Sequence, residues 1–245
     1  MSDSVNKNYS DNRAKEWFVP KLGPQKFRSF IGLLFLPYTA MVLAFAVIGS
    51  MTAETIAWDR VLAIVIIYFL GLGIAAHALD ALGSKKVKPW GNVFTRRQLW
   101  LLTAAPLALA YLIAIYYMVR WVPWLATVAI LEGFFVFSYN LEWFGGRFHK
   151  DSWFAFSWGF LPVVAGHIIQ TNTISATAMV LATSMALFSM VEIKASRPYK
   201  DLKRQRQSLN EGEKLLVQRY EAILKSISLA VILLGIGMFM GRAVQ

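Results

Sequence analysis

The chain has 245 residues, of which 57% are hydrophobic and only 16% are charged. This composition is far more apolar than that of an ordinary soluble domain and argues against one. There is no cysteine, which excludes disulfides, thiol nucleophiles and cysteine-based metal sites. The 25 basic and 14 acidic residues give a net charge of +11. In a membrane protein such an excess is typical of cytoplasmic loops rather than of nucleic-acid binding.

The hydropathy pattern predicts an all-α, polytopic transmembrane helical bundle with about seven spans. Residues 1–27 are polar and basic, contain two prolines, and are expected to form a cytoplasmic tail without the pattern of a cleaved signal peptide. Residues 28–245 are interpreted as a single transmembrane domain. Apolar stretches long enough to cross a bilayer lie at roughly 29–50, 58–80, 98–118, 122–140, 152–170, 175–193 and 223–241.

Small residues and proline indicate how some spans pack. The fifth stretch contains Pro162, several small residues and His167, which predicts a bent helix inside the bundle, with the histidine in a packing role. The GLGIAA segment at 71–76 and the pair Gly237 and Gly241 predict close helix–helix contacts.

The distribution of basic residues predicts the topology. With seven spans, 22 of the 25 basic residues fall on one side of the membrane, and only Arg60, Arg120 and Arg242 fall on the other. The positive-inside rule then places the N-terminus in the cytoplasm of a multi-pass cell-membrane protein and the C-terminus outside. Three cytoplasmic loops are expected, at 81–97, 141–151 and 194–222. In the last loop, Ser208 and Glu211 have the spacing of a capping box and predict the start of a helix.

Ionisable residues gather at the predicted cytoplasmic ends of three spans, where such costly groups are expected to face a polar cavity. The second span ends with three polar residues on one helical face, followed by two lysines: His77, Asp80, Ser84, Lys85 and Lys86. The fourth ends with Tyr139, Asn140, Glu142, Arg147, His149 and Asp151. The sixth ends with Glu192, Lys194, Ser196, Arg197 and Lys200. In addition, Glu132 lies in the middle of the fourth span and needs a polar partner.

An acidic residue near a helix end, followed by several cations, suits the binding of a diphosphate. Carboxylates coordinate Mg²⁺, the ion bridges phosphate oxygens, and Lys or Arg neutralises the remaining charge. Loss of the diphosphate leaves an allylic cation, which aromatic rings stabilise. The nine Trp, nine Tyr and seventeen Phe residues could line such a site, and they are also ordinary membrane-interface residues.

These clusters resemble those of the UbiA superfamily of intramembrane prenyltransferases. The family has an NxxxDxxxD motif after its second helix and a DxxxD motif after its sixth, and a YxxxK motif near the prenyl site. Asp80 matches the first aspartate of the first motif, with Ala76 and Ser84 at the other two positions. Glu192 and Ser196 stand at the second motif. Tyr139 matches the tyrosine of the third, with Trp143 in place of the lysine.

The resemblance implies an all-helical bundle that transfers a prenyl group from a prenyl diphosphate to a lipophilic acceptor. It implies catalytic roles for Asp80, Glu192 and Tyr139, with Mg²⁺ held by the two carboxylates. Substrate binding would fall to the surrounding polar residues: His77, Ser84, Lys85, Lys86, Asn140, Glu142, Arg147, His149, Lys194, Ser196 and Arg197.

Two alternatives stay open at this level. One is a non-catalytic bundle that binds a prenyl lipid or quinone, or serves as a structural subunit with a protein partner or as a homo-oligomer. Its motivation is the loss of the second aspartate from both motifs and of the last family helices. The other is a transporter, because intramembrane acids are common among transporters, although no inverted repeat is visible.

Overall fold

The computed structural model describes residues 16–83, 90, 93–204 and 209–244, and within these the protein is helical, with no strand. Two segments, η1 and η2, have π-helical hydrogen bonding, and the others are α-helical. The elements in chain order are α2 (Gln25–Leu33), α3 (Leu36–Ser50), α4 (Trp58–Tyr68), η1 (Phe69–Ala76), α5 (His77–Gly83), α6 (Arg96–Arg120), α7 (Leu125–Asn140), α8 (Trp143–Gly146), α9 (Asp151–Ala155), η2 (Phe156–Phe160), α10 (Leu161–Thr171), α11 (Ala176–Arg204) and α12 (Glu211–Ala243).

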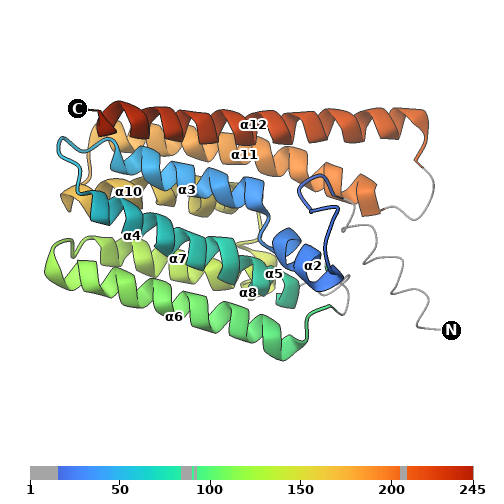
Figure 1. Ribbon diagram of the computed structural model, residues 1–245, viewed down its shortest axis with the longest axis horizontal. Coiled ribbons are helices and arrows are strands. Elements are labelled where there is room, and N and C mark those ends of the chain that lie inside the picture. Colours follow the sequence, from blue (N-terminus) through green and yellow to red (C-terminus); the bar gives the residue numbers. More distant parts are fainter. Residues whose placement is uncertain (1–15, 84–89, 91–92, 205–208, 245) are drawn as a thin grey trace.

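The apolar helices are those of a multi-pass membrane protein. Six continuous stretches are long and apolar enough to cross a bilayer: Gln25–Ser50, Trp58–Gly83, Arg96–Arg120, Asp151–Thr171, Ala176–Lys203 and Glu211–Ala243. The remaining expected span, α7, has 16 residues. At 1.5 Å per residue its length is about 24 Å, shorter than the ~30 Å hydrocarbon core. It lies beside the other helices all the same (Figure 1).

The long helices run side by side, with α11 and α12 along one edge of the bundle, α6 along the opposite edge, and α3, α4, α7 and α10 between them (Figure 1). Successive helices alternate in direction, so the bundle has two distinct ends. We call the end where α5, α7 and α11 finish, and where α6, α9 and α12 begin, the polar end. The other end is the opposite end.

Basic residues are segregated between the two ends. Among the described residues, the opposite end holds Arg60, Arg120 and Arg242. Arg60 donates hydrogen bonds to the carbonyl oxygens of Ile169 and Gln170 at 3.2 and 3.1 Å, where the carboxyl end of α10 favours a cation. Arg242 donates to backbone carbonyls of the α3–α4 connection. The basic residues at this end are therefore used in part to complete the hydrogen bonding of connections and helix ends.

Helix α3 is packed tightly against α10 through glycines. A Cβ atom on Gly166 would lie 2.0 Å from the carbonyl oxygen of Ala46, and one on Gly49 would lie 2.0 Å from that of Val163. Only glycine permits such an approach, which is a common way for membrane helices to associate. Because α10 is inserted in this way, the expected position of the fifth span inside the bundle is confirmed.

The predicted glycine contact of the last span is wrong. Among the described residues, nothing lies within 4 Å of a Cβ built on Gly237 or Gly241. Instead α12 approaches α3 through Gly235. A Cβ atom on Gly235 would lie 2.9 Å from the Cβ atom of Ala44. The GxxxG spacing identified small residues on α12 but not the face that packs.

The fifth span changes its helical winding before its proline. Residues Phe156–Phe160 are π-helical, and α10 follows with Pro162 in its first turn. A proline cannot donate the backbone hydrogen bond of a regular helix, so the wider turn before it accommodates the missing donor. π-helical turns are often found at functional sites, and η2 carries Trp158 into the middle of the bundle.

The expected tail, residues 1–27, contains a packed segment. Glu16 and Val19 are each 5% exposed, and the ring of Phe18 lies 4.9 Å from that of Phe35. Residues 1–15 lie outside the described residues. Helix α2 begins at Gln25, within the stretch expected to be tail.

The start of the last helix differs from the prediction. Ser208 lies outside the described residues, and α12 begins at Glu211 with Asn210 as its cap. The Asn210 side chain accepts from the Glu213 backbone N–H, and the Glu213 carboxylate accepts from the Asn210 N–H, both at 2.9 Å. The capping box is therefore present two residues later than expected, because asparagine also serves as a strong N-cap. Much of the expected loop at 194–222 is helical, in α11 and α12.

A candidate site at the polar end of the bundle

The polar residues that follow the second, fourth and sixth predicted spans meet at the polar end. Arg197 of α11 interacts with the hydroxyl of Tyr139 at the end of α7, and Tyr139 also lies within electrostatic range of Asp80 and Glu192. Because these groups come from α5, α7 and α11, only the tertiary fold brings them together. We call the wider set the polar cluster, which consists of Asp80, Tyr139, His149, Asp151, Glu192, Arg197 and Lys200.

The connection after α7 folds over Tyr139. The imidazole of His149 stacks on the Tyr139 ring with centroids 4.5 Å apart, and its Nδ1 lies 3.0 Å from the Tyr139 carbonyl oxygen. Arg197 joins the same connection through an ion pair with Asp151, at 3.0 Å between Nε and Oδ1, and a 3.4 Å hydrogen bond to the His149 carbonyl oxygen. Arg197 therefore ties α11 to both α7 and α9.

Three residues of the cluster region share one face of α11. Glu192 is 4% exposed and Ser196 is fully buried, and Lys200 follows after another four residues, so the three lie on successive turns. Lys200 and Glu192 interact electrostatically. The Lys200 ammonium also lies 5.1 Å from the centre of the Phe35 ring, a cation–π contact. Ser196 lies beside the hydroxyl of Tyr38.

The charges of the cluster largely offset one another. Three carboxylates, those of Asp80, Asp151 and Glu192, face two cations, those of Arg197 and Lys200. Buried charges are costly unless they are paired in this way. An incoming diphosphate would therefore compete with the carboxylates for the two cations, unless a divalent ion joined the carboxylates to the phosphate.

The carboxylates offer a limited metal site. Among the residues described, no group of three or more His, Asp and Glu side chains is placed to hold an ion. Asp80 and Glu192 are two oxygen donors of the kind that Mg²⁺ prefers, and Mg²⁺ commonly uses one or two carboxylates with water and phosphate oxygens as its other ligands. By their chemistry, these two donors suit one Mg²⁺ that is bound together with a phosphate group.

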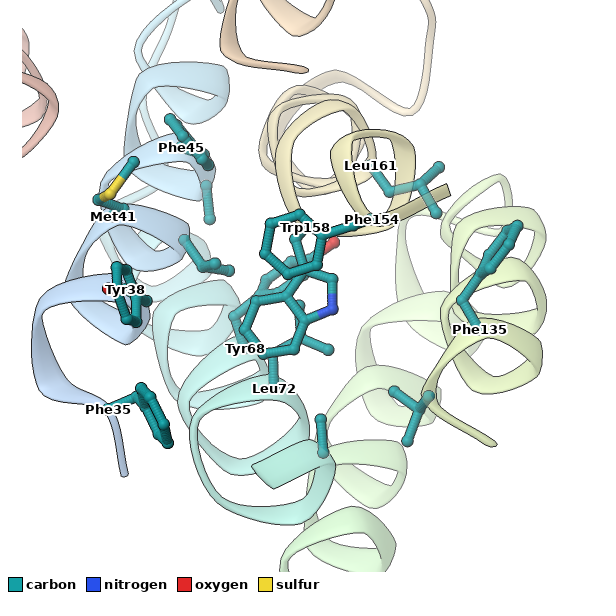
Figure 2. Close-up of a cluster of buried hydrophobic side chains, with 14 of the residues drawn as sticks. Phe35, Tyr38, Met41, Phe45, Tyr68, Leu72, Phe135, Phe154, Trp158 and Leu161 are labelled. Atoms are coloured by element: carbon teal, nitrogen blue, oxygen red, sulfur yellow. The ribbon is translucent and has the colours of Figure 1, made fainter. Parts of the chain in front are cut away.

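Aromatic side chains fill the interior next to the cluster. The His77 ring lies between the rings of Phe35 and Trp158, at centroid distances of 5.1 and 5.2 Å. Figure 2 shows Trp158 in the middle of this interior, with Phe35 and side chains of α3 on one side and Phe135 of α7 on the other. Phe35 adopts a left-handed backbone conformation, with φ of 45°, which is uncommon for a bulky residue. The His77 ring that stacks on Phe35 and the Lys200 ammonium over the Phe35 ring therefore both lie at this strained turn between α2 and α3.

Other predicted site residues differ in their exposure and local contacts. Lys194 and Arg147 are exposed. Asn140 is buried, and its amide donates to the Val136 carbonyl oxygen of its own helix at 2.8 Å. Glu142 is half-buried in a left-handed conformation at the start of α8. Three predicted residues lie outside the described part of the chain: Ser84, Lys85 and Lys86.

Other contributors were not predicted. Tyr38, Phe35 and Trp158 all lie in apolar stretches, where nothing distinguishes an aromatic side chain at a site from one in the core. The expected packing role of His167 is supported, because its Nδ1 lies 2.7 Å from the Thr52 hydroxyl.

Comparisons with known proteins return no relative: no family model, no curated protein and no solved structure matches the chain. The resemblance to the UbiA superfamily therefore rests on residues of this sequence. Of these, Asp80, Tyr139 and Glu192 are the ones that the fold brings together.

Proposed function

We propose that this protein is an intramembrane transferase of the UbiA type, which moves a prenyl group from its diphosphate to a lipophilic acceptor at the polar cluster. The observation that carries the proposal is the convergence on Tyr139 of Asp80 from α5 and of Glu192 and Arg197 from α11. Carboxylates, cations and an aromatic hydroxyl are the groups that this chemistry needs, and three separate helices supply them.

The diphosphate would lie at the polar end, against the cations of the cluster. Arg197 can present two N–H groups to phosphate oxygens, and Lys200 can add a point charge. Asp80 and Glu192 would hold Mg²⁺, which supplies further neutralisation of the phosphate charge. The cluster then favours departure of the diphosphate by stabilising the negative charge that develops on it.

The prenyl chain would extend into the aromatic interior. In the reaction, the bond between the first prenyl carbon and the diphosphate oxygen breaks, and the diphosphate leaves with the electron pair. The faces of rings such as Tyr139 and Trp158 stabilise the resulting allylic cation. The nucleophilic atom of the acceptor forms a new bond to that carbon and loses a proton.

The polar end would face the cytoplasm. Among the described residues, most basic side chains lie toward this end, which supports the orientation through the positive-inside rule. A water-soluble counterion or a diphosphate released in the reaction would then enter or leave on the cytoplasmic side.

Metal-dependent binding tests the proposal. The detergent-purified protein is titrated with a long-chain prenyl diphosphate, with and without Mg²⁺, and compared with Asp80→Asn and Glu192→Gln. Glu54→Gln is the matched control, because Glu54 is an exposed acid at the opposite end. We expect saturable, Mg²⁺-dependent binding in the wild type and control, and at least about tenfold weaker binding in the other two variants. Binding that ignores the metal and both carboxylates refutes the assignment.

A second function is favoured by the internal pairing of the cluster. The ion pair between Arg197 and Asp151 and the electrostatic interaction of Lys200 with Glu192 also suit a structural role, in a bundle that binds a lipid without reacting with it or that completes a larger complex. In that case the wild type would not bind prenyl diphosphate, and it would be isolated with a stoichiometric membrane partner.

A further inference from the structure

A second polar feature lies deeper in the bundle, in a cavity between α4, η1, α6 and α7. The cavity has about 60 Å³ of space for the centres of water-sized atoms, and about 10–15 Å³ of such space holds one water molecule. The space exists because small residues line it, among them Gly71, Ala110, Ala114, Ala129 and Gly133. It is partly open to the outside of the bundle.

Glu132 lines this cavity, and only one of its two carboxyl oxygens has a hydrogen-bond partner among the described residues. Glu132 Oε1 accepts a hydrogen bond from the Tyr68 hydroxyl at 2.9 Å. Its Oε2 is buried and has no hydrogen-bond partner among the residues that the structure describes. The other nearby hydroxyl, that of Tyr111, donates to the Ala129 carbonyl oxygen at 2.8 Å. A residue that lines this cavity therefore has one buried carboxyl oxygen without a partner among the described residues.

An unpartnered carboxyl oxygen in a membrane helix needs an explanation. Buried polar atoms are nearly always hydrogen-bonded, and ionisable residues within spans are costly and usually functional. The Tyr68 contact alone would be served by a single acceptor, such as a glutamine oxygen. The cavity that Glu132 lines has room for a small molecule, and a modest rotation of the carboxyl group would let such a molecule pair with it.

We propose that this cavity binds an uncharged lipophilic alcohol that enters from the bilayer, with its hydroxyl group paired to the Glu132 carboxyl group. A hydroxyl both donates and accepts, so it satisfies a carboxyl group in either protonation state. The Tyr68 and Tyr111 hydroxyls already donate hydrogen bonds within the protein, and apart from Glu132 the other lining residues are apolar and uncharged. Glu132 lies seven residues before Tyr139 on α7, about 10 Å along the helix axis, so this cavity is separate from the polar cluster.

The fluorinated probe 4-(trifluoromethyl)benzyl alcohol tests the proposal through its ¹⁹F NMR signal. It is titrated into the detergent-purified protein at a fixed micelle concentration. The methyl ether of the same probe is the ligand control, because it has no O–H donor. We expect saturable binding of the alcohol, at least about tenfold tighter than that of the ether, since a hydrogen bond to a carboxyl group is lost in the ether.

Two variants locate the binding in this cavity. Gly71→Leu fills it, because nothing lies within 4 Å of a Cβ at Gly71, while Glu132 is left intact. Gly237→Leu makes the same change at an equally open position on α12 and is the matched control. Glu132→Leu removes the carboxyl group itself. We expect the alcohol to lose saturable binding in Gly71→Leu and Glu132→Leu and to retain it in Gly237→Leu.

Several results would overturn the proposal. They are equal affinity for the alcohol and its ether, unchanged binding in Gly71→Leu, no saturable binding in the wild type, or a preference for 4-(trifluoromethyl)benzylamine, which would indicate a cation site. None of these depends on prenyl diphosphate or Mg²⁺. The outcome is therefore independent of the proposed transferase activity.

Discussion

Replacing Gly166 by alanine tests the contact that fixes α10 against α3. The added Cβ would lie 2.0 Å from the Ala46 carbonyl oxygen, and ordinary contacts begin at 3.4 Å. The two helices would have to separate by about 1.4 Å, because the obstructing atom belongs to the backbone. Overpacking of this kind costs about 1–3 kcal/mol, and alanine regains up to ~1 kcal/mol in helix propensity.

Taking the middle of the overpacking range, the net destabilisation is about 1–2 kcal/mol, or a fall of roughly 2–8 °C in Tm for a domain of this size. Thermal unfolding in detergent, followed by near-UV circular dichroism, measures it. Gly237→Ala is the control, because its Cβ meets nothing within 4 Å among the described residues, and it should leave Tm unchanged or slightly raised. Equal Tm values for the two variants would show that α3 and α10 do not approach each other this closely.

Two further predictions concern the polar end. The chain has no native cysteine, and Val244 and Leu22 are exposed residues at opposite ends of the bundle. In intact spheroplasts, a membrane-impermeant maleimide should label Val244→Cys but not Leu22→Cys. The reverse pattern would overturn the proposed orientation. Asp151→Asn should cost at most about 1 kcal/mol, as its ion pair is partly exposed. Arg197→Leu should cost more in thermal unfolding, because the hydrogen bond to the His149 carbonyl oxygen and the interaction with Tyr139 are also lost, and equal costs would contradict this.

The charged residues of the candidate site could be predicted from the sequence. Asp80 and Glu192 stand out in the sequence because a carboxylate next to a span is costly and needs a reason. Their partners were less predictable. Arg197 and Lys194 are three residues apart, yet one ties α11 to α7 and α9 while the other is exposed. Spacing along a helix tells which residues share a face, but the neighbouring helices decide which face is buried.

The aromatic members of the site could not be predicted individually. Trp158 and Phe35 lie in stretches where most positions are apolar, so the hydrophobic pattern does not show which side chains face the site. Their positions next to His77 depend on a π-helical turn before Pro162 and on a left-handed residue between α2 and α3. Both are local departures from regular helix, and they are held in place by contacts from other spans.

The sequence by itself determined that this is a multi-pass, all-helical membrane protein with its basic residues gathered at one end, because burial in lipid requires long apolar helices and charge placement is local along the chain. The tertiary structure decided which glycines pack, so that Gly235 contacts α3 while Gly237 and Gly241 do not. It also decided which polar groups meet, since Tyr139 and Glu132 both lie on α7 but reach different partners. These choices depend on the relative rotation of whole helices, a property that no single segment contains.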